Sequence, residues 1–144
     1  MNTGKPNSFA SHHGSGIGNM DTNQLESSVE VLEESVINMA IESWRFGRVF
    51  NRLLGKLDAG EHKRYHGQFN WFIKSIEESL NKSGLKIVNV EGHPYDPGIA
   101  ATPLNIDEFD ENDQLMVDQM LEPIIMSNEG LVKTGTVTLR RLDK

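Results

Sequence analysis

The stretch GLKIVNVEGHPYDP, residues 84–97, decides the fold, because the spacing of apolar residues changes within it. Before Gly84, apolar residues recur every three or four positions, as on one face of a helix, and from Leu85 the period becomes two, which is typical of strands. Gly84 stands where the end of a helix favours a residue that tolerates positive φ. We therefore predict an α+β protein in which a helical part, residues 21–83, precedes a small β domain, residues 84–144.

The second half of the same stretch can be interpreted in two ways. His93 and Asp96 lie three apart and could both move protons, which suggests acid–base chemistry. The density of proline and glycine instead favours a turn, in which Gly92 starts the turn and Asp96 before Pro97 caps it. Tyr95 suits a position that fills the β core with its hydroxyl at the rim. We favour the turn over an active-site loop.

Upstream, a long amphipathic helix is predicted over residues 22–58. Asp21 and Gln24 form a capping-box signal at its start. The apolar positions that follow are spaced by four and three alternately, which is heptad spacing and favours a coiled-coil or bundle contact. These positions are Leu25, Val29, Leu32, Val36, Met39, Ser43, Phe46, Phe50, Leu53 and Leu57, of which only Ser43 is not apolar.

The length of this helix leaves alternatives open. A second apolar set, formed by Ile37, Ala40, Ile41 and Trp44, widens the apolar face midway, so more than one neighbour is expected there. Roughly 36 residues of helix rise about 54 Å, which exceeds what a small domain covers. Either the helix breaks near Gly47 or Gly55, or a second subunit covers it. We predict a homodimer whose interface consists of Leu25, Val29, Leu32, Val36, Met39, Phe46, Phe50 and Leu53.

The remaining elements follow from local patterns. Residues 1–20 are rich in Asn, Ser, Gly and His and are expected to be a disordered tail. A second helix, with the apolar stripe Tyr65, Phe69, Phe72, Ile73, Ile76 and Leu80, should form an antiparallel hairpin with the first. Residues 85–90 predict a strand, residues 114–126 a second β-rich region, and residues 131–139 a closing hairpin.

Composition excludes several classes of partner. The chain of 144 residues carries a net charge of −7, which opposes binding to nucleic acid or to anionic lipid. It contains no cysteine, which removes thiol chemistry and disulfides and fits a reducing compartment. No apolar run is long enough to span a bilayer, and the N-terminus lacks an export pattern. We expect a soluble cytoplasmic protein.

Candidate catalytic and metal motifs are weak. The acidic run at residues 107–113 lacks the glycine and the distal glutamate of an EF-hand loop, so we expect a solvated loop between strands. His62 and His66 have metal-ligand spacing but no acidic partner on their face, and we interpret them as a surface pair. No serine lies in a nucleophile-elbow context and no phosphate-binding loop follows a strand. We expect no enzyme activity, cofactor or bound metal.

The junction stretch resembles the corresponding part of the GrpE family, the nucleotide exchange cochaperones of DnaK-type heat-shock ATPases. The family pattern is a glycine that ends the helix, a short apolar strand, a second glycine and then x-Pro-Phe-Asp-Pro. The matching residues here are Gly84, Gly92, Pro94, Tyr95, Asp96 and Pro97, with Tyr in place of Phe. A second segment is similar to the family's last hairpin, at Lys133, Gly135, Val137 and Leu139. The resemblance covers residues 22–141, and only the β half carries motifs.

The resemblance implies a non-covalent function. A dimer would bind the ATPase domain of a DnaK-type chaperone and favour an open cleft, so that ADP leaves faster. The implied contact surface consists of His93, Tyr95, Pro97, Ile124, Ile125 and Met126. The family's His-Glu pair after Asp-Pro is missing, because residues 98–102 read GIAAT. That difference leaves open an adaptor that docks to an ATPase or chaperone assembly without exchange activity.

Overall fold

The computed structural model describes residues 21–142, which lie in two compact units divided between Val36 and Ile37. The predicted tail, residues 1–20, lies outside the described part of the chain. Helix α2 (Thr22–Leu54) contains residues of both units. The capping box at its start is confirmed, because the Gln24 N–H donates to Asp21 Oδ1 at 2.8 Å and the Asp21 N–H donates to Gln24 Oε1 at 3.2 Å.

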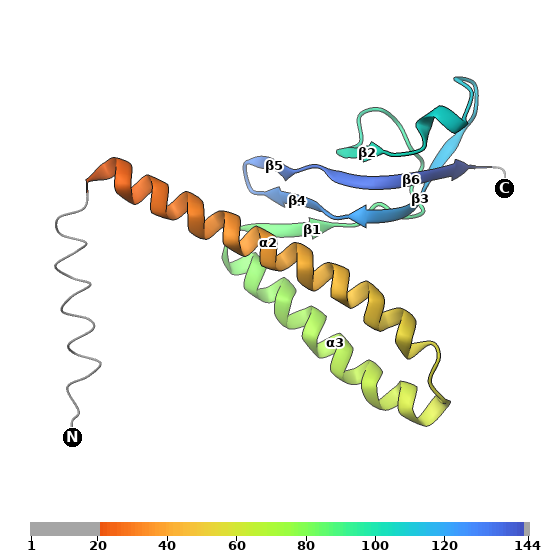
Figure 1. The fold of residues 1–144 in the computed structure, drawn as a ribbon, viewed down its shortest axis with the longest axis horizontal. Helices are drawn as coiled ribbons and strands as arrows, with labels where there is room; N and C mark the ends of the chain where they lie inside the picture. The colour runs from red at the N-terminus through yellow and green to blue at the C-terminus, as the bar shows by residue number, and fades with distance from the viewer. Residues whose placement is uncertain (1–20, 143–144) are drawn as a thin grey trace. The chain divides into compact units, whose positions relative to one another are not determined.

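Helix α3 (Ala59–Lys82) forms a hairpin with the second part of α2 (Figure 1). Its first turn is capped by Asp58, whose Oδ1 accepts the Glu61 N–H at 2.9 Å. After Lys82 the chain reaches Gly84, which has a φ of 76° and ends the helix as predicted.

Gly47 is a packing position in this hairpin and does not break the helix. A Cβ at Gly47 would lie 3.2 Å from Cδ1 of Ile73 on α3, so its missing side chain lets the two helices approach closely. Near it, the rings of Phe50 and Phe69 lie 5.7 Å apart, between centroids. Of the alternatives left open by the sequence, a break near Gly47 is therefore excluded, and α2 ends at Leu54, directly before Gly55.

The β half contains two three-stranded sheets. In one, strands β1 (Leu85–Val88), β4 (Ile124–Ser127) and β5 (Gly130–Lys133) are all antiparallel, in the order β1-β4-β5. In the other, β6 (Gly135–Arg141) lies between β2 (Ala101–Pro103), to which it is parallel, and β3 (Leu115–Glu122), to which it is antiparallel. A short 3₁₀ turn, η1 (Ile106–Glu108), precedes β3. Figure 1 shows these strands in the C-terminal half of the chain.

In the sheet around β6, buried and less buried residues alternate along β6, and the pairing of β3 with β6 has two register shifts. Gly135, Val137 and Leu139 of β6 are buried, as expected for a strand with one face on the core. The buried residues of β3 are Val117 and Met120, which are three apart. The pairing register shifts between Val117 and Gln119, and such a bulge turns the following side chain back toward the core.

The predicted closing hairpin over residues 131–139 is wrong. β5 pairs with β4, whereas β6 pairs with β2 and β3, so the two strands belong to different sheets. The change of sheet occurs at Gly135, where a Cβ would lie 2.8 Å from Cγ1 of Ile124 and 2.9 Å from the carbonyl oxygen of Glu122. Only glycine fits this close approach.

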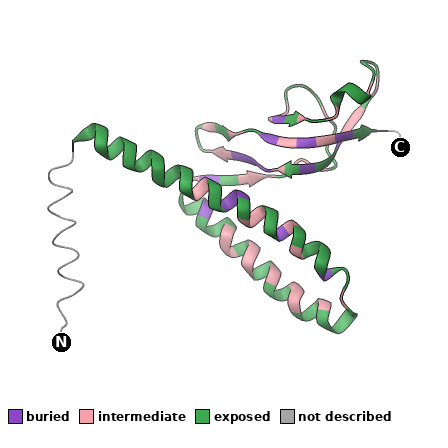
Figure 2. Ribbon diagram, viewed as in Figure 1, coloured by how far each residue is buried: buried purple, intermediate pink, exposed green. Residues whose placement is uncertain are grey.

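The two sheets share one core, and α2 contributes to it. Its buried members are Ala101, Val117, Met120, Ile124, Val137 and Leu139. Trp44 of α2 packs against this cluster, together with Tyr95 and Phe109. Figure 2 shows the buried residues concentrated in the strands and on part of α2. Helices followed by strands confirm the α+β class, whereas the dimerising stem stays a prediction.

Candidate functional site

The predicted turn forms a fixed corner beside β3. The segment from Gly92 to Tyr95 runs antiparallel to β3, with a bridge between Pro94 and Met116. The Gly92 N–H donates to the Val117 carbonyl at 2.9 Å, the Val117 N–H donates to the His93 carbonyl at 2.9 Å, and the Tyr95 N–H donates to the Leu115 carbonyl at 2.8 Å. Pro94 lacks an N–H, so it fits a position at the edge of the sheet.

The second part of the corner is closed by Asp96. Its Oδ1 accepts the Gly98 N–H at 2.7 Å, and its carbonyl accepts the Ile99 N–H at 3.0 Å. This is the capping role predicted from the Asp-Pro pair. Gly92 has a φ of 81°, a backbone conformation that favours glycine. The corner is therefore held by backbone hydrogen bonds and by one side-chain cap.

The residues predicted to bind a partner do not all reach the surface. His93 and Pro97 are exposed, and Tyr95 and Met126 are half-buried. Ile124 and Ile125 have only 3% and 0% of their surface exposed, so they cannot contribute to a contact surface and that prediction is corrected. Both lie on β4, in the middle of its sheet, where neighbouring elements cover both faces. The candidate surface is thereby reduced to the corner and Met126.

Two arginines of α2 attach the helix to the β sheets. Arg48 Nη2 lies 2.7 Å from Glu91 Oε2, and the same oxygen accepts the Met120 N–H at 2.7 Å. The Arg48 guanidinium also lies over the Trp44 ring, 4.9 Å from its centroid. These contacts join α2, the corner and β3. Sequence reasoning missed them, since Glu91 carried no signal beyond its place in the junction stretch.

Arg45 makes the second attachment. Its Nη2 lies 2.8 Å from Glu122 Oε2 on β3, and its Nη1 lies 2.6 Å from Glu42 Oε2 on the same helix. The other oxygen of Glu122 accepts the Thr136 hydroxyl of β6 at 2.7 Å. Arg45 therefore attaches α2 to β3 and β6, whereas Arg48 attaches it to Glu91 beside the corner.

Most of the heptad positions of α2 are exposed to solvent. We call this set the α2 stripe: Leu25, Val29, Leu32, Val36, Met39, Phe46, Phe50 and Leu53. Leu32 is 66% exposed and Met39 is 70% exposed, while Val36 and Phe50 are half-buried. The residues of α2 that are buried are others: Ala40, Ile41, Gly47 and Leu54. A row of exposed apolar side chains is unusual unless another molecule covers it.

The other candidate motifs give no catalytic or metal centre. The His62 and His66 rings are stacked with centroids 5.3 Å apart, so the two residues do form a pair, and both are half-buried. Within residues 21–142, no group of three or more His, Asp or Glu side chains is placed to hold a metal ion. The acidic run lies between β2 and β3 and is largely exposed, as predicted for a solvated loop.

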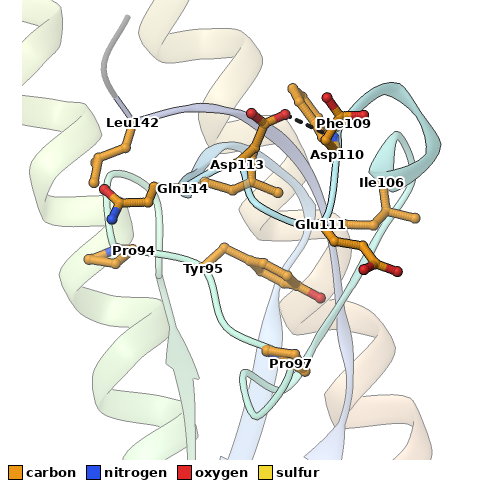
Figure 3. A pocket seen from close by; sticks show the side chains of 11 residues that line it. Pro94, Tyr95, Pro97, Ile106, Phe109, Asp110, Glu111, Asp113, Gln114 and Leu142 are labelled. Carbon is orange, nitrogen blue, oxygen red and sulfur yellow. Dashed lines mark hydrogen bonds between the residues drawn. The ribbon is translucent and has the colours of Figure 1, made fainter.

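A groove of about 620 Å³ lies next to the corner. Pro94, Tyr95 and Pro97 line it on the corner side, and the loop before β3 lines it opposite (Figure 3). The lining residues from that loop and from the following strands are Ile106, Phe109, Asp110, Glu111, Asp113, Gln114, Leu115 and Leu142. The groove is therefore apolar inside and acidic along one edge.

Comparisons with protein families, with curated proteins and with solved structures give no match to this chain. Within the described residues, no helix combines the length and the apolar character needed to cross a membrane. The functional conclusion therefore depends on the residues and geometry of the chain itself.

Proposed function

We propose that this protein is a GrpE-like nucleotide exchange cochaperone, which binds the ATPase domain of a DnaK-type chaperone and promotes release of ADP. The observation that carries the proposal is the corner. Its motif residues fold into one fixed element at the surface, where exposed His93 and Pro97 flank half-buried Tyr95. The order of a helical pair followed by a small β half also agrees with the resemblance.

Exchange by binding requires a surface that prefers one conformation of its partner. A ligand with equal affinity for the open and closed ATPase shifts nothing, however tightly it binds. A corner held by three backbone hydrogen bonds to β3 and by the ion pair of the adjacent Glu91 with Arg48 of α2 would keep its shape against the partner. Such pre-organisation lowers the entropy lost on binding and favours the partner conformation that fits the corner.

We also propose that the α2 stripe is the homodimer interface. Its residues keep the heptad spacing that a facing helix requires, and all of them except the half-buried Val36 and Phe50 are exposed, while other residues of α2 are buried. Covering an exposed leucine or methionine of this kind stabilises an assembly by about 1.5–3 kcal/mol per side chain at most. Several such residues are enough to offset the entropy of association.

The exchange proposal is tested on the ATPase domain of the organism's own DnaK-type chaperone, loaded with a fluorescent ADP analogue. Addition of the full-length protein should accelerate release of the analogue. His93→Ala should reduce that acceleration without changing thermal stability, since His93 is exposed. Lys63→Ala, which changes an exposed residue of α3, is the matched control. Unchanged release at saturating protein would contradict the proposal.

Dimerisation is tested separately by sedimentation over a range of concentrations. Leu32→Glu and Met39→Glu should each shift the protein toward monomer, because a carboxylate would then be buried opposite an apolar neighbour. Glu34→Gln, at an exposed position of the same helix outside the stripe, should leave the association unchanged. A monomer at every concentration would refute the dimer while leaving the exchange test intact.

One observation favours a second function, an adaptor without exchange activity. After Asp96 the chain continues through Gly98 and Ile99 into β2, so the position of the family's His-Glu pair holds no ionisable side chain. An adaptor would bind the same ATPase domain and leave ADP release unchanged. Measuring binding and release on the same samples separates the two functions.

A further inference from the structure

We propose that the groove beside the corner binds a short extended segment of a partner protein in which lysine or arginine flanks an apolar residue. This inference goes beyond nucleotide exchange, since it assigns a peptide-binding site to the β half. It starts from the volume of the groove, about 620 Å³, which lies in the range of ligand sites in proteins.

The inside of the groove suits an apolar side chain. Pro94 and Pro97 present rigid rings on one side, with Tyr95 between them and Ile106 across from them (Figure 3). Ile106 and Leu142 are each 41% exposed, so part of this apolar surface is in contact with water. An apolar side chain placed here would displace that water, which is favourable.

The carboxylates along one edge of the groove favour an occupant with positive charge. Asp110, Glu111 and Asp113 all line it, and the described lining residues include neither Lys nor Arg. Asp113 is partly neutralised, because Arg141 Nε lies 3.3 Å from its Oδ2 and the same oxygen accepts the Asp110 N–H at 2.9 Å. Asp110 and Glu111 are exposed, and no Lys or Arg side chain of residues 21–142 forms an ion pair with either carboxylate.

This charge pattern points to one class of occupant. A segment with basic residues on either side of its apolar anchor would meet these carboxylates as the anchor enters. The same acidic groove of a second copy is a poor occupant, because the like charges of the two grooves repel each other. Nucleic acid and anionic lipid are disfavoured for the same reason. In a peptide segment of this kind, the apolar residue fits the apolar lining of the groove and the basic residues pair with its carboxylates.

Both walls of the groove are held in place by contacts within the protein. One wall is the corner, which is fixed to β3 by backbone hydrogen bonds at Tyr95 and Gly92. On the other wall, the Arg141 guanidinium lies 5.3 Å from the centroid of the Phe109 ring and holds the loop to β6. The two walls are thus shaped before a ligand arrives, which reduces the entropy cost of binding.

The test uses the full-length protein and a fluorescein-labelled peptide with a Lys-Arg pair on each side of Leu-Pro-Leu. Fluorescence anisotropy should show saturable binding that weakens as salt is added, because salt screens the exposed carboxylates. A peptide with glutamate in place of every basic residue, and one with Gly-Ser-Gly in place of Leu-Pro-Leu, should not bind. The assay contains neither chaperone nor nucleotide, so its result is independent of the exchange test.

Variants locate the binding. Glu111→Lys should lower the affinity for the peptide about tenfold, since the attraction between a carboxylate and the basic residues of the peptide becomes a repulsion. Leu142→Ser should weaken it about fivefold by removing apolar surface, at a position that is already partly exposed. Glu129→Lys, an equal charge change at an exposed turn residue between β4 and β5, should change binding less than about twofold. Amide shifts on titration should concentrate at Tyr95, Asp96 and residues 106–115.

Several results would overturn the proposal. Equal binding of the glutamate peptide would show that charge plays no part. Equal weakening by Glu129→Lys and Glu111→Lys would show a general charge effect without a site. Amide shifts elsewhere would place the peptide outside the groove. Loss of self-association in Glu111→Lys, measured by sedimentation, would make a second copy the occupant instead.

Discussion

Glu91 connects the α2 helix, the corner and β3 through a single carboxylate oxygen. Its Oε2 lies 2.7 Å from Arg48 Nη2 and accepts the N–H of Met120 at 2.7 Å. Met120 is a core residue, and this N–H is donated at one of the register shifts of β3, where strand pairing is irregular. We predict that Glu91→Ala weakens the attachment of the corner and lowers the stability of the protein.

The expected magnitude follows from these two contacts. A hydrogen bond to a charged acceptor contributes about 1.5–3 kcal/mol, and its loss leaves a partly buried N–H without this partner. The ion pair adds less than about 1 kcal/mol. Its side chains, Arg48 and Glu91, are 29% and 28% exposed, so water weakens their attraction. Glu91→Ala should therefore lower the free energy of unfolding by about 2–4 kcal/mol. Glu91→Gln, which keeps an acceptor and loses the charge, should cost about 1 kcal/mol.

Urea denaturation at one fixed protein concentration measures both variants, because association would otherwise shift the apparent stability. Glu129→Ala, at an exposed turn position, is the matched control and should change stability by less than about 0.5 kcal/mol. A loss below about 1 kcal/mol in Glu91→Ala would refute the reasoning. Equal losses in the Ala and Gln variants would show that the charge, and not the hydrogen bond to Met120, carries the effect.

Three further substitutions test individual features of the β half. Gly135→Ala should cost about 1–3 kcal/mol, because the new Cβ would lie 2.8 Å from Cγ1 of Ile124, and an unchanged thermal midpoint would contradict this. Asn105→Ala should lower the free energy of unfolding by about 1–3 kcal/mol, because the Asn105 side chain donates to the Leu139 carbonyl at 3.0 Å and accepts the Leu139 N–H at 2.9 Å. Slower amide exchange at Leu139 in the variant would argue against this. Gly92→Ala should cost about 1–2 kcal/mol through its φ of 81°, and calorimetry showing no loss would refute that strain.

The elements set by near neighbours could be predicted from the sequence. The capping box of Asp21 and Gln24, the glycine that ends α3 and the cap made by Asp96 all involve residues at most three positions apart. The heptad spacing also predicted an apolar face of α2, most of which is exposed and which does not contain the buried residues Ala40, Ile41, Gly47 and Leu54. Such signals depend on local backbone geometry, which the chain carries wherever it folds.

The candidate site was predicted only in part. His93, Tyr95 and Pro97 follow from the junction stretch, and the structure places them together on the corner. Ile124 and Ile125 were wrong, because a short apolar run has the same pattern whether one face or both faces are covered. The groove had no sequence signal, since it brings residues 94–97 against residues 106–115 and Leu142.

By itself, the sequence determined the α+β order, the start of α2, the end of α3, the turn at residues 92–98 and the apolar face of α2. Only the tertiary structure decided that β5 and β6 enter different sheets, that Ile124 and Ile125 of β4 are buried and that Glu91 contacts Arg48. The physical reason is the distance along the chain. Turns and caps are selected by the conformations of a few adjacent residues, whereas strand pairing and ion pairs depend on which distant segments bury the most apolar surface together.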